Sequence, residues 1–247
     1  MLWDVRCLVL SDIHGNWPAL EAVLRQAPPH DQVLFLGDAV GYYPDGARVL
    51  DWLKSVDAVC IRGNHDDWML RPHQLRRGSP IHDILAWQQE RLTPQQIEYI
   101  QSWPVQRLVA QALMVHGSPC DPVVYVDDLE AARKGFDCTD ARWTFFGHTH
   151  LAGAFLALSG PNGNWVRQQR QGAFSELVLA PRARALVNPG SVGQPRDGQP
   201  TAAYALWIPD EQTVEFYRVA FDLEPLRLRM DEAQFPQWLF ERLKHGK

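Results

Sequence analysis

The sequence predicts an α/β fold with two stacked β-sheets, and two observations carry this prediction. In the first quarter of the chain, apolar segments of strand length alternate with helical segments. From residue 105 onward, short strand-like segments dominate. Strands separated by helices form a parallel sheet with right-handed crossovers, and a second, stacked sheet accommodates the later strands. We expect a single domain over residues 1–247, because a chain of this length can bury one large core.

The alternation begins at the amino terminus. Residues 5–10 form a near-continuous apolar run, which is typical of a strand buried on both faces. A helix should follow, since Asn16 or Trp17 can begin it and Pro18 fits its first turn. The next expected elements are a strand over 32–36, a helix over 47–53 and a strand over 58–61.

The middle of the chain is helical in pattern, and we expect a helical cap inserted over residues 67–103. Ser79-Pro80 predicts the start of one helix, and 93–96 has the spacing of a capping box. The strands expected afterwards are 107–110, 112–115, 143–146, 154–158, 177–179, 202–207 and 214–219. A hairpin turn is expected at 161–164 and one or two helices over 224–244.

Charge and composition disfavour several classes of protein. A net charge of -5 would repel phosphate backbones and anionic lipids, which disfavours general nucleic-acid or membrane-surface binding. No apolar run approaches the ~20 residues that span a bilayer, and no signal-peptide pattern opens the chain, so a cytoplasmic location is expected. The four cysteines include no Cys-x-x-Cys pair, and we expect them to be reduced and structural. The sequence does not define the oligomeric state, and a homo-oligomer is possible.

Five short segments place metal-ligand residue types directly after apolar strands. The segments are 11–14, 37–38, 63–66, 115–117 and 147–150. Because the carboxyl ends of parallel strands share one edge of a sheet, these residues should converge on a single crevice. Taken alone, Asp12 with His14 would be read as a turn that caps the next helix, and His116 as a strand-end histidine. The recurrence favours a metal site instead.

The ligand chemistry indicates which metals fit. Asp12 and Asp38 would repel each other at close range unless cations lay between them. Mixed oxygen and nitrogen donors suit transition metals better than calcium or magnesium. We therefore expect two divalent transition-metal ions per chain, with manganese favoured over iron, zinc, cobalt or nickel.

In order along the chain, these motifs resemble those of the calcineurin-like metallophosphoesterases. The shared pattern is Asp-x-His, Gly-Asp, Gly-Asn-His-Asp, His and Gly-His-x-His, over residues 11–150. The resemblance implies a four-layer α-β-β-α sandwich, in which two mixed β-sheets pack face to face with helices outside. It implies two ions bridged by Asp38, the first held also by Asp12, His14 and His150 and the second by Asn64, His116 and His148. It also implies that His65 donates a proton to the leaving oxygen or stabilises the transition state, and that Asp66 orients His65.

The resemblance also narrows the substrate. Protein phosphatases of this superfamily carry Gly-Asp-x-Val-Asp-Arg-Gly, whose arginine binds phosphate, whereas residues 37–43 read Gly-Asp-Ala-Val-Gly-Tyr-Tyr. The chain is more similar to small bacterial phosphodiesterases described as diadenosine-tetraphosphatase-like, which share the segment 188–198. Further candidates, for contact with the substrate, are Arg62, Tyr43, Ser191 and Arg196.

The expected function is therefore hydrolysis of a phosphodiester or phosphomonoester, with a nucleotide-like small molecule favoured as substrate. Hydroxide bridging the two cations is the expected nucleophile. The alternative is a metal-binding interaction scaffold of the same fold with little catalysis. Such scaffolds typically lose the catalytic histidine, and His65 is present. A nuclease is disfavoured because it would need a basic groove.

Overall fold

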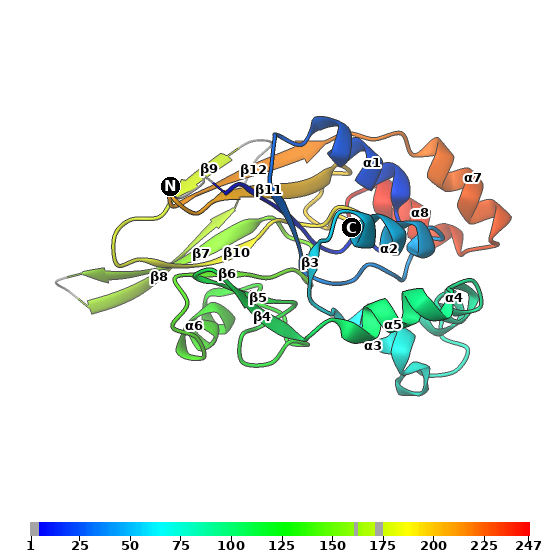
Figure 1. Ribbon diagram of the computed structural model, residues 1–247, viewed down its shortest axis with the longest axis horizontal. Coiled ribbons are helices and arrows are strands. Elements are labelled where there is room, and N and C mark those ends of the chain that lie inside the picture. The colour runs from blue at the N-terminus through cyan, green and yellow to red at the C-terminus, as the bar shows by residue number, and fades with distance from the viewer. Residues whose placement is uncertain (1–4, 161–162, 171–174) are drawn as a thin grey trace.

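The computed structural model describes residues 5–160, 163–170 and 175–247, and it forms two six-stranded mixed sheets packed face to face (Figure 1). The first sheet has the order β3-β2-β1-β11-β12-β9, with β1 Cys7–Leu10, β2 Gln32–Phe35, β3 Val59–Cys60, β9 Ser175–Val178, β11 Ala202–Ile208 and β12 Thr213–Val219. The second has the order β4-β5-β6-β10-β7-β8, with β4 Gln106–Val109, β5 Ala112–Val115, β6 Trp143–Phe145, β7 Gly153–Gly160, β8 Gly163–Arg170 and β10 Arg184–Asn188.

Helices cover the outer faces of both sheets, which confirms the predicted four-layer arrangement (Figure 1). They are α1 Trp17–Gln26, α2 Gly46–Ser55, α3 Asn64–Leu70, α4 Pro80–Gln89, α5 Pro94–Ser102, α6 Leu129–Asp137, α7 Glu224–Glu232 and α8 Gln237–Lys244, with a short 3₁₀ helix at Pro72–Gln74. Helix α1 packs on β11 and β12 of the first sheet, and α6 packs on β7 and β8 of the second.

The strand β1 shows why the apolar run at 5–10 has no polar alternation. Leu8 and Leu10 pack under the helices that cover the first sheet. Cys7 and Val9 point the other way, into the core between the sheets, where they meet Trp143, Phe145 and Trp207. A strand in the middle of a four-layer sandwich buries both faces, so every position is apolar.

The helix boundaries follow the predicted caps. The side chain of Asn16 accepts a hydrogen bond from the Ala19 amide, and that of Ser79 from the His82 amide. Thr93 and Gln96 form the reciprocal bonds of a capping box. The prediction missed β8, β10 and α6, and it placed the start of the helical segment at residue 67, inside α3. Asp128 caps α6 and is a residue type that often begins helices, so α6 could have been predicted.

The helical segment over 67–103 shares its core with the first sheet. Met69, Leu85 and Ile100 belong to the same hydrophobic cluster as Leu8 and Leu20. The side chain of Gln88 on α4 also accepts a hydrogen bond from the Gly41 amide at 2.9 Å and donates one to the Gly41 carbonyl at 3.0 Å. This segment therefore fixes the loop that follows β2. The turn expected at 161–164 falls partly outside the described residues, and the strands on either side of it pair antiparallel.

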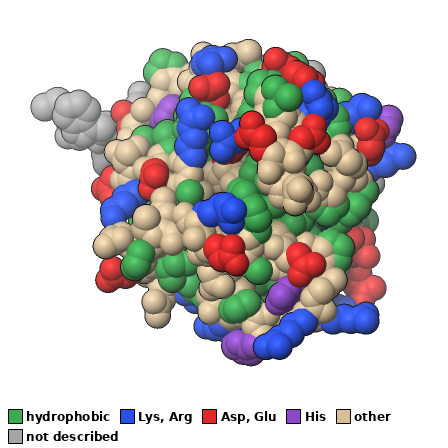
Figure 2. Space-filling model, turned by 90° about the vertical axis from the view of Figure 1, so that its right-hand side faces the viewer, with side chains coloured by type: hydrophobic (Ala, Val, Ile, Leu, Met, Phe, Trp, Pro, Cys, Tyr) green, Lys and Arg blue, Asp and Glu red, His purple; other side chains and the backbone are tan. Residues whose placement is uncertain are grey.

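The surface is mixed in charge. On the face seen from the right-hand side of Figure 1, acidic and basic side chains are interspersed (Figure 2). In the described part of the chain, no helix combines the length and apolar character that crossing a membrane requires.

Two of the four cysteines correct the expectation that all are reduced. Cys120 and Cys138 form a disulfide, whereas Cys7 and Cys60 are free and buried. The bond joins the loop after β5 to the carboxyl end of α6. The two cysteines are 18 positions apart in the sequence, and no spacing motif marks such a pair.

Loss of this disulfide should lower the free energy of unfolding. A cross-link that closes a loop of this size restricts the unfolded chain and contributes about 3 kcal/mol. We expect Cys138→Ser, and wild type kept in dithiothreitol, to unfold at lower urea concentration than oxidised wild type. Dithiothreitol should have no further effect on Cys138→Ser. Equal urea midpoints for all samples would show that the disulfide does not stabilise the fold.

Candidate metal centre

The predicted ligands converge where loops from both sheets meet. Asp12, Asp38 and Asn64 follow β1, β2 and β3 of the first sheet. His116 follows β5, and His148 and His150 follow β6, both in the second sheet. Backbone hydrogen bonds hold the loops together: the Asp12 amide donates to the Gly37 carbonyl at 3.0 Å, and the Gly147 amide to the His116 carbonyl at 2.8 Å. The site therefore lies at the shared edge of the two sheets.

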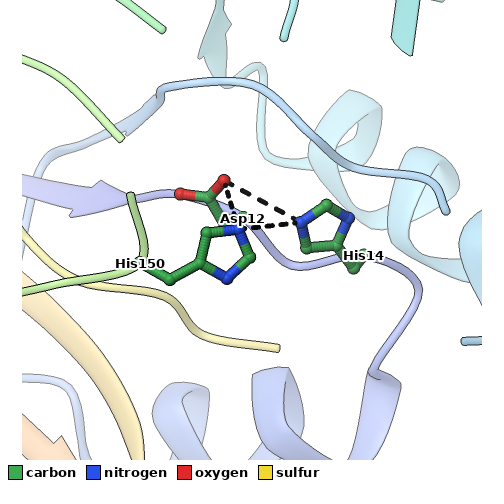
Figure 3. Close-up of side chains that lie close together, drawn as sticks. All are labelled: Asp12, His14 and His150. Atoms are coloured by element: carbon green, nitrogen blue, oxygen red, sulfur yellow. Dashed lines mark hydrogen bonds and ion pairs between the residues drawn. The ribbon is translucent and has the colours of Figure 1, made fainter. Parts of the chain in front are cut away.

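One group of ligand atoms comes from Asp12, His14 and His150 (Figure 3). The Nε2 atoms of His14 and His150 lie 3.3 Å apart. The Asp12 Oδ1 atom lies 3.8 Å from the first of these nitrogens and 3.2 Å from the second. All three side chains are buried. One cation could contact all three atoms at once.

A second group comes from Asp38, His116 and His148. The His116 Nε2 atom lies 3.2 Å from Asp38 Oδ2 and 3.2 Å from Asn64 Oδ1. Asp38 also faces the first group, because its Oδ2 lies 3.7 Å from His14 Nε2. This carboxylate is therefore placed between the two groups. The structure brings all seven predicted ligands together.

The backbone sets the orientation of four imidazoles. The Nδ1 atoms of His14, His116 and His150 face the carbonyls of Val40, Leu36 and Gln194 at 3.0, 2.7 and 2.5 Å. His148 uses its Nε2 atom instead, 3.1 Å from the Val123 carbonyl. A carbonyl can only accept a hydrogen bond, so the facing ring nitrogen carries the proton. The other nitrogen of each ring then offers a lone pair.

The electrostatics of the site fit a cation. Asp12 Oδ1 is buried and has no hydrogen-bond donor in the described residues, although three imidazole nitrogens lie 3.2 to 3.9 Å away. Burial would raise the pKa of Asp12, but His150 and His116 outweigh it and the pKa is lowered. Burial likewise opposes a charged His116, yet Asp38 and Asp12 raise its pKa to about 10. The carboxylates thus demand positive charge, which a metal ion supplies more fully than one imidazolium.

Most of the ligands hold a strained backbone. Asp12, His14, Asp38, His148 and His150 all have φ between 51° and 64°, in the left-handed region that non-glycine residues rarely adopt. Such conformations cost of order 1–3 kcal/mol each and persist only where the surroundings enforce them. Five such residues lie among the seven predicted ligands. The geometry of this site is therefore maintained at the expense of local backbone stability.

Glycines allow the ligand loops to approach this closely. A Cβ atom on Gly147 would lie 1.9 Å from Ser11 Oγ and 2.6 Å from Asp12 Oδ2. A Cβ atom on Gly63 would lie 2.1 Å from Asp38 Oδ1. In this packing, Asp12 Oδ2 accepts hydrogen bonds from Ser11 Oγ at 2.6 Å and the His148 amide at 3.1 Å. One oxygen of Asp12 is therefore anchored, and the other is free for a metal.

The structure corrects the expected role of Asp66. Its carboxylate accepts hydrogen bonds from the amides of Asp38 at 2.7 Å, Ala39 at 2.9 Å and Gly63 at 3.0 Å, rather than from His65. It lies in the first turn of α3, so its side chain reaches back to the amides around the helix start. Burial and the nearby Asp38 raise the pKa of Asp66 to about 7, although the hydrogen bonds from backbone amides lower it. Asp66 thus positions the Asp38 loop, and the Nδ1 atom of His65 is buried without a partner in the described chain.

The segment 188–198 returns to the site, as the sequence suggested, and braces it. Ser191 Oγ donates to the Asp12 carbonyl at 2.8 Å, and the Asn188 side chain donates to the Gly147 carbonyl at 2.8 Å. Gly193 lies against Ile13 so closely that a Cβ would be 1.9 Å from its carbonyl oxygen. Ser191 is fully buried, so it supports the metal loop and is not exposed to substrate.

A cleft of about 360 Å³ opens over the ligands. Besides ligand side chains, it is lined by His65, Tyr42, Trp68, Ile81, Val123, Tyr125 and Arg196. Of the four residues that the sequence suggested for contact with the substrate, Arg196 alone is among these lining residues. Tyr43 is fully buried, and Arg62 is engaged with Asp67 at 2.9 Å and the Gln101 carbonyl at 3.1 Å. Both positions are at odds with a substrate contact.

Sequence reasoning missed Tyr42 and Tyr125 as cleft residues. Tyr42 follows the Gly-Asp motif closely and could have been considered with it. Tyr125 belongs to an irregular segment between β5 and α6 that carries no motif, and only the folded chain brings it over His148, with ring centres 4.2 Å apart.

Comparisons with known proteins agree with this geometry. An uncharacterized protein of Methanocaldococcus jannaschii is 27% identical, with 97% of each chain covered. A metallophosphoesterase crystal structure from Sphaerobacter thermophilus is 31% identical, with a TM-score of 0.86 over 99% of this chain and 100% of that one. A crystal structure described as a candidate diadenosine tetraphosphatase is 16% identical, with a TM-score of 0.51 over 89% of this chain and 96% of that one, and shows the fold alone. The model of the calcineurin-like phosphoesterase superfamily domain matches residues 5–210, and the chain belongs to that family.

Proposed function

We propose that this chain is a dinuclear metal-dependent phosphoesterase that hydrolyses a small phosphodiester or phosphomonoester, with a nucleotide-like substrate favoured. The observation that carries the proposal is the pair of buried ligand groups with Asp38 between them. Asp12, His14, Asp38 and His150 would hold one ion, and Asp38, Asn64, His116 and His148 the other. When bound, the ions would supply Lewis-acid stabilisation of phosphoryl oxygens and a nucleophilic water at neutral pH.

The protein's own residues would position the reaction. The carbonyls behind His14, His116 and His150 fix which ring nitrogen carries the proton in the neutral imidazole, so the opposite nitrogen would be the one that holds the ion. The burial of these ligands excludes bulk water and strengthens each electrostatic interaction with the phosphoryl group. The open cleft above them admits the ester.

His65 would act on the leaving oxygen from the side of the cleft. It lines the cleft, its amide donates to Asp38 Oδ1 at 2.8 Å, and its ring packs between Tyr42 and Trp68. Burial lowers its pKa to about 4, so the ring is neutral at pH 7. A neutral imidazole donates one N–H and is a weak source of a full proton. Of the two roles that the resemblance implies, hydrogen bonding to the transition state is therefore favoured.

Several finer expectations stand as proposals with this one. Manganese is the favoured metal, because the mixed donor set suits transition metals. We also propose that residues 1–247 are a single domain, in which the segment over 67–103 borders the cleft through Trp68 and Ile81. A cytoplasmic location is expected from the sequence, although the Cys120–Cys138 disulfide weighs against it, since such bonds persist in oxidising compartments.

The first test measures metal content and hydrolysis together. Purified protein should contain about two transition-metal ions per chain by mass spectrometry. With manganese added it should hydrolyse bis(p-nitrophenyl) phosphate, p-nitrophenyl phosphate or both, and chelation followed by gel filtration should abolish turnover. Metal-loaded protein that cleaves neither ester with any divalent ion would favour the interaction scaffold over the hydrolase.

The second test concerns His65. We expect His65→Ala to keep its metal content while turnover falls by roughly 10²- to 10⁴-fold, as for the loss of a positioned catalytic histidine. His82→Ala, at a histidine outside the cleft, is the matched control and should behave as wild type. The cluster of His14, Asp38 and His65 offers a competing geometry in which His65 itself is a ligand. Loss of metal from His65→Ala would select that geometry, and unchanged turnover would remove His65 from the mechanism.

The third test concerns the close packing behind Asp12. Gly147→Ala places a methyl group against Ser11 and Asp12, so the anchored carboxylate must shift. We expect manganese affinity to fall by roughly 10- to 100-fold, as for disturbed supports of metal ligands. Gly78→Ala also strains the backbone, since φ is 74° at this residue, but its methyl would meet nothing within 4 Å and no metal-binding side chain, so it should keep wild-type affinity. Competition with a metal-binding dye measures both variants, and equal affinities would contradict the packing argument.

A further inference from the structure

Arg196 lies in the cleft, and in the described part of the chain it has no acidic side chain as a partner. The Arg196 guanidinium donates to the Tyr42 hydroxyl at 3.1 Å, to the Gln194 side-chain oxygen at 3.1 Å and to the Tyr125 hydroxyl at 3.5 Å. These acceptors are neutral, and within the described ranges no carboxylate lies within 4.0 Å of the guanidinium. The adjacent acid, Asp197, pairs with Arg218 instead. The guanidinium is half-buried and its hydrogen-bond partners are neutral, so its positive charge favours the binding of an anion.

This arginine is fixed next to the metal ligands. Its amide donates to the His150 carbonyl at 3.3 Å, and it belongs to the segment that braces the Asp12 loop. The Tyr42 ring, which receives its hydrogen bond, lies with its centre 4.4 Å from that of His14. The guanidinium is therefore held in place before any ligand arrives, which reduces the entropy lost on binding.

Two aromatic side chains flank the same cleft. Trp68 packs on His65 with ring centres 4.8 Å apart, and Tyr125 packs on His148 at 4.2 Å. Both line the cleft, and Tyr125 is 45% exposed. Aromatic rings that line a cleft, one exposed and one half-buried, suit the stacking of a planar heterocycle. Ile81 and Val123 add apolar contact area on the wall.

We infer that Arg196 binds the phosphoryl group of the substrate and that Trp68 and Tyr125 bind a nucleobase, which makes the substrate a nucleotide ester. The inference rests on the proposed phosphoesterase function and deepens it. Tyr42 occupies the position at which the protein phosphatases carry an arginine, and Arg196 reaches the hydroxyl of that tyrosine from another loop. The positive charge of the cleft thus comes from the segment over 188–198 rather than from the loop after β2.

The phosphate contact is tested by binding as well as by turnover. Isothermal titration calorimetry would measure inorganic phosphate and adenosine 5′-monophosphate against the manganese-loaded full chain. Arg196→Met should weaken both ligands by about 10- to 100-fold, the range for hydrogen bonds to a charged group. Arg196→Lys keeps the charge without the fork and should be intermediate. Arg25→Met, at an exposed arginine outside the cleft, should bind as wild type.

The base contact has its own variants. Trp68→Ala should keep phosphate affinity and lose about tenfold or more in affinity for the nucleotide. Tyr125→Ala also removes a hydrogen-bond partner of Arg196, so it should lower the affinity for the nucleotide by about tenfold more than the affinity for phosphate. For ester hydrolysis, Arg196→Met should raise KM more than it lowers kcat if its contact is made in the bound ground state. Unchanged phosphate binding in both Arg196 variants would overturn the phosphate contact. An unchanged ratio of nucleotide to phosphate affinity in both aromatic variants would overturn the base site.

These outcomes are separable from failure of the proposed function. Wild-type protein that cleaves no ester would refute the phosphoesterase proposal, and the calorimetry would still decide whether Arg196 holds phosphate. Active wild-type protein with full phosphate affinity in Arg196→Met would refute this inference and leave the phosphoesterase proposal intact.

Discussion

The burial of two carboxylates opposite converging imidazole lone pairs is the constraint on which the rest of the site depends. Asp12 and Asp38 are buried, and hydrogen-bond donors from Ser11, His65 and His148 hold one oxygen of each carboxylate. The other oxygen faces imidazole nitrogens, at 3.2 Å from His150 for Asp12 and 3.2 Å from His116 for Asp38. Such a group needs positive charge, and it needs the loops to stay close. The left-handed ligands, the glycines at 63 and 147 and the three amides bound by Asp66 are all consequences of that second need.

Much of this could be predicted because it is local. The strand β1 is apolar throughout since both faces are buried, and the capping side chains of Asn16, Ser79 and Thr93 bind amides three residues ahead. The ligand motifs are short and follow strands. What escaped prediction is non-local. The Cys120–Cys138 bond joins segments whose proximity depends on α6, and Asp66 binds the amides of Asp38 and Ala39 in the loop after β2 rather than the imidazole of the adjacent His65.

The cleft shows the same division between local and non-local information. Its floor consists of motif residues, which a sequence reader finds in order. Its walls come from α3, the start of α4, the loop after β5 and the segment 188–198, and side chains such as Tyr125 acquire meaning only from their neighbours. The residues of the walls can therefore change, and with them the substrate that is recognised, while the residues of the floor stay the same. For this reason membership of the family says more about the type of reaction than about the substrate.

The proposed ligands follow strands of both sheets: Asp12, Asp38 and Asn64 follow strands of the first sheet, and His116, His148 and His150 follow strands of the second. A bound pair of ions would cross-link the two sheets at this edge of the sandwich. Sliding or separating the two halves would then require breaking coordination bonds as well as exposing the apolar interior. The metal centre that would hydrolyse esters would therefore also stabilise the fold. The fraction of chains with bound metal would determine how readily the two sheets separate at that edge.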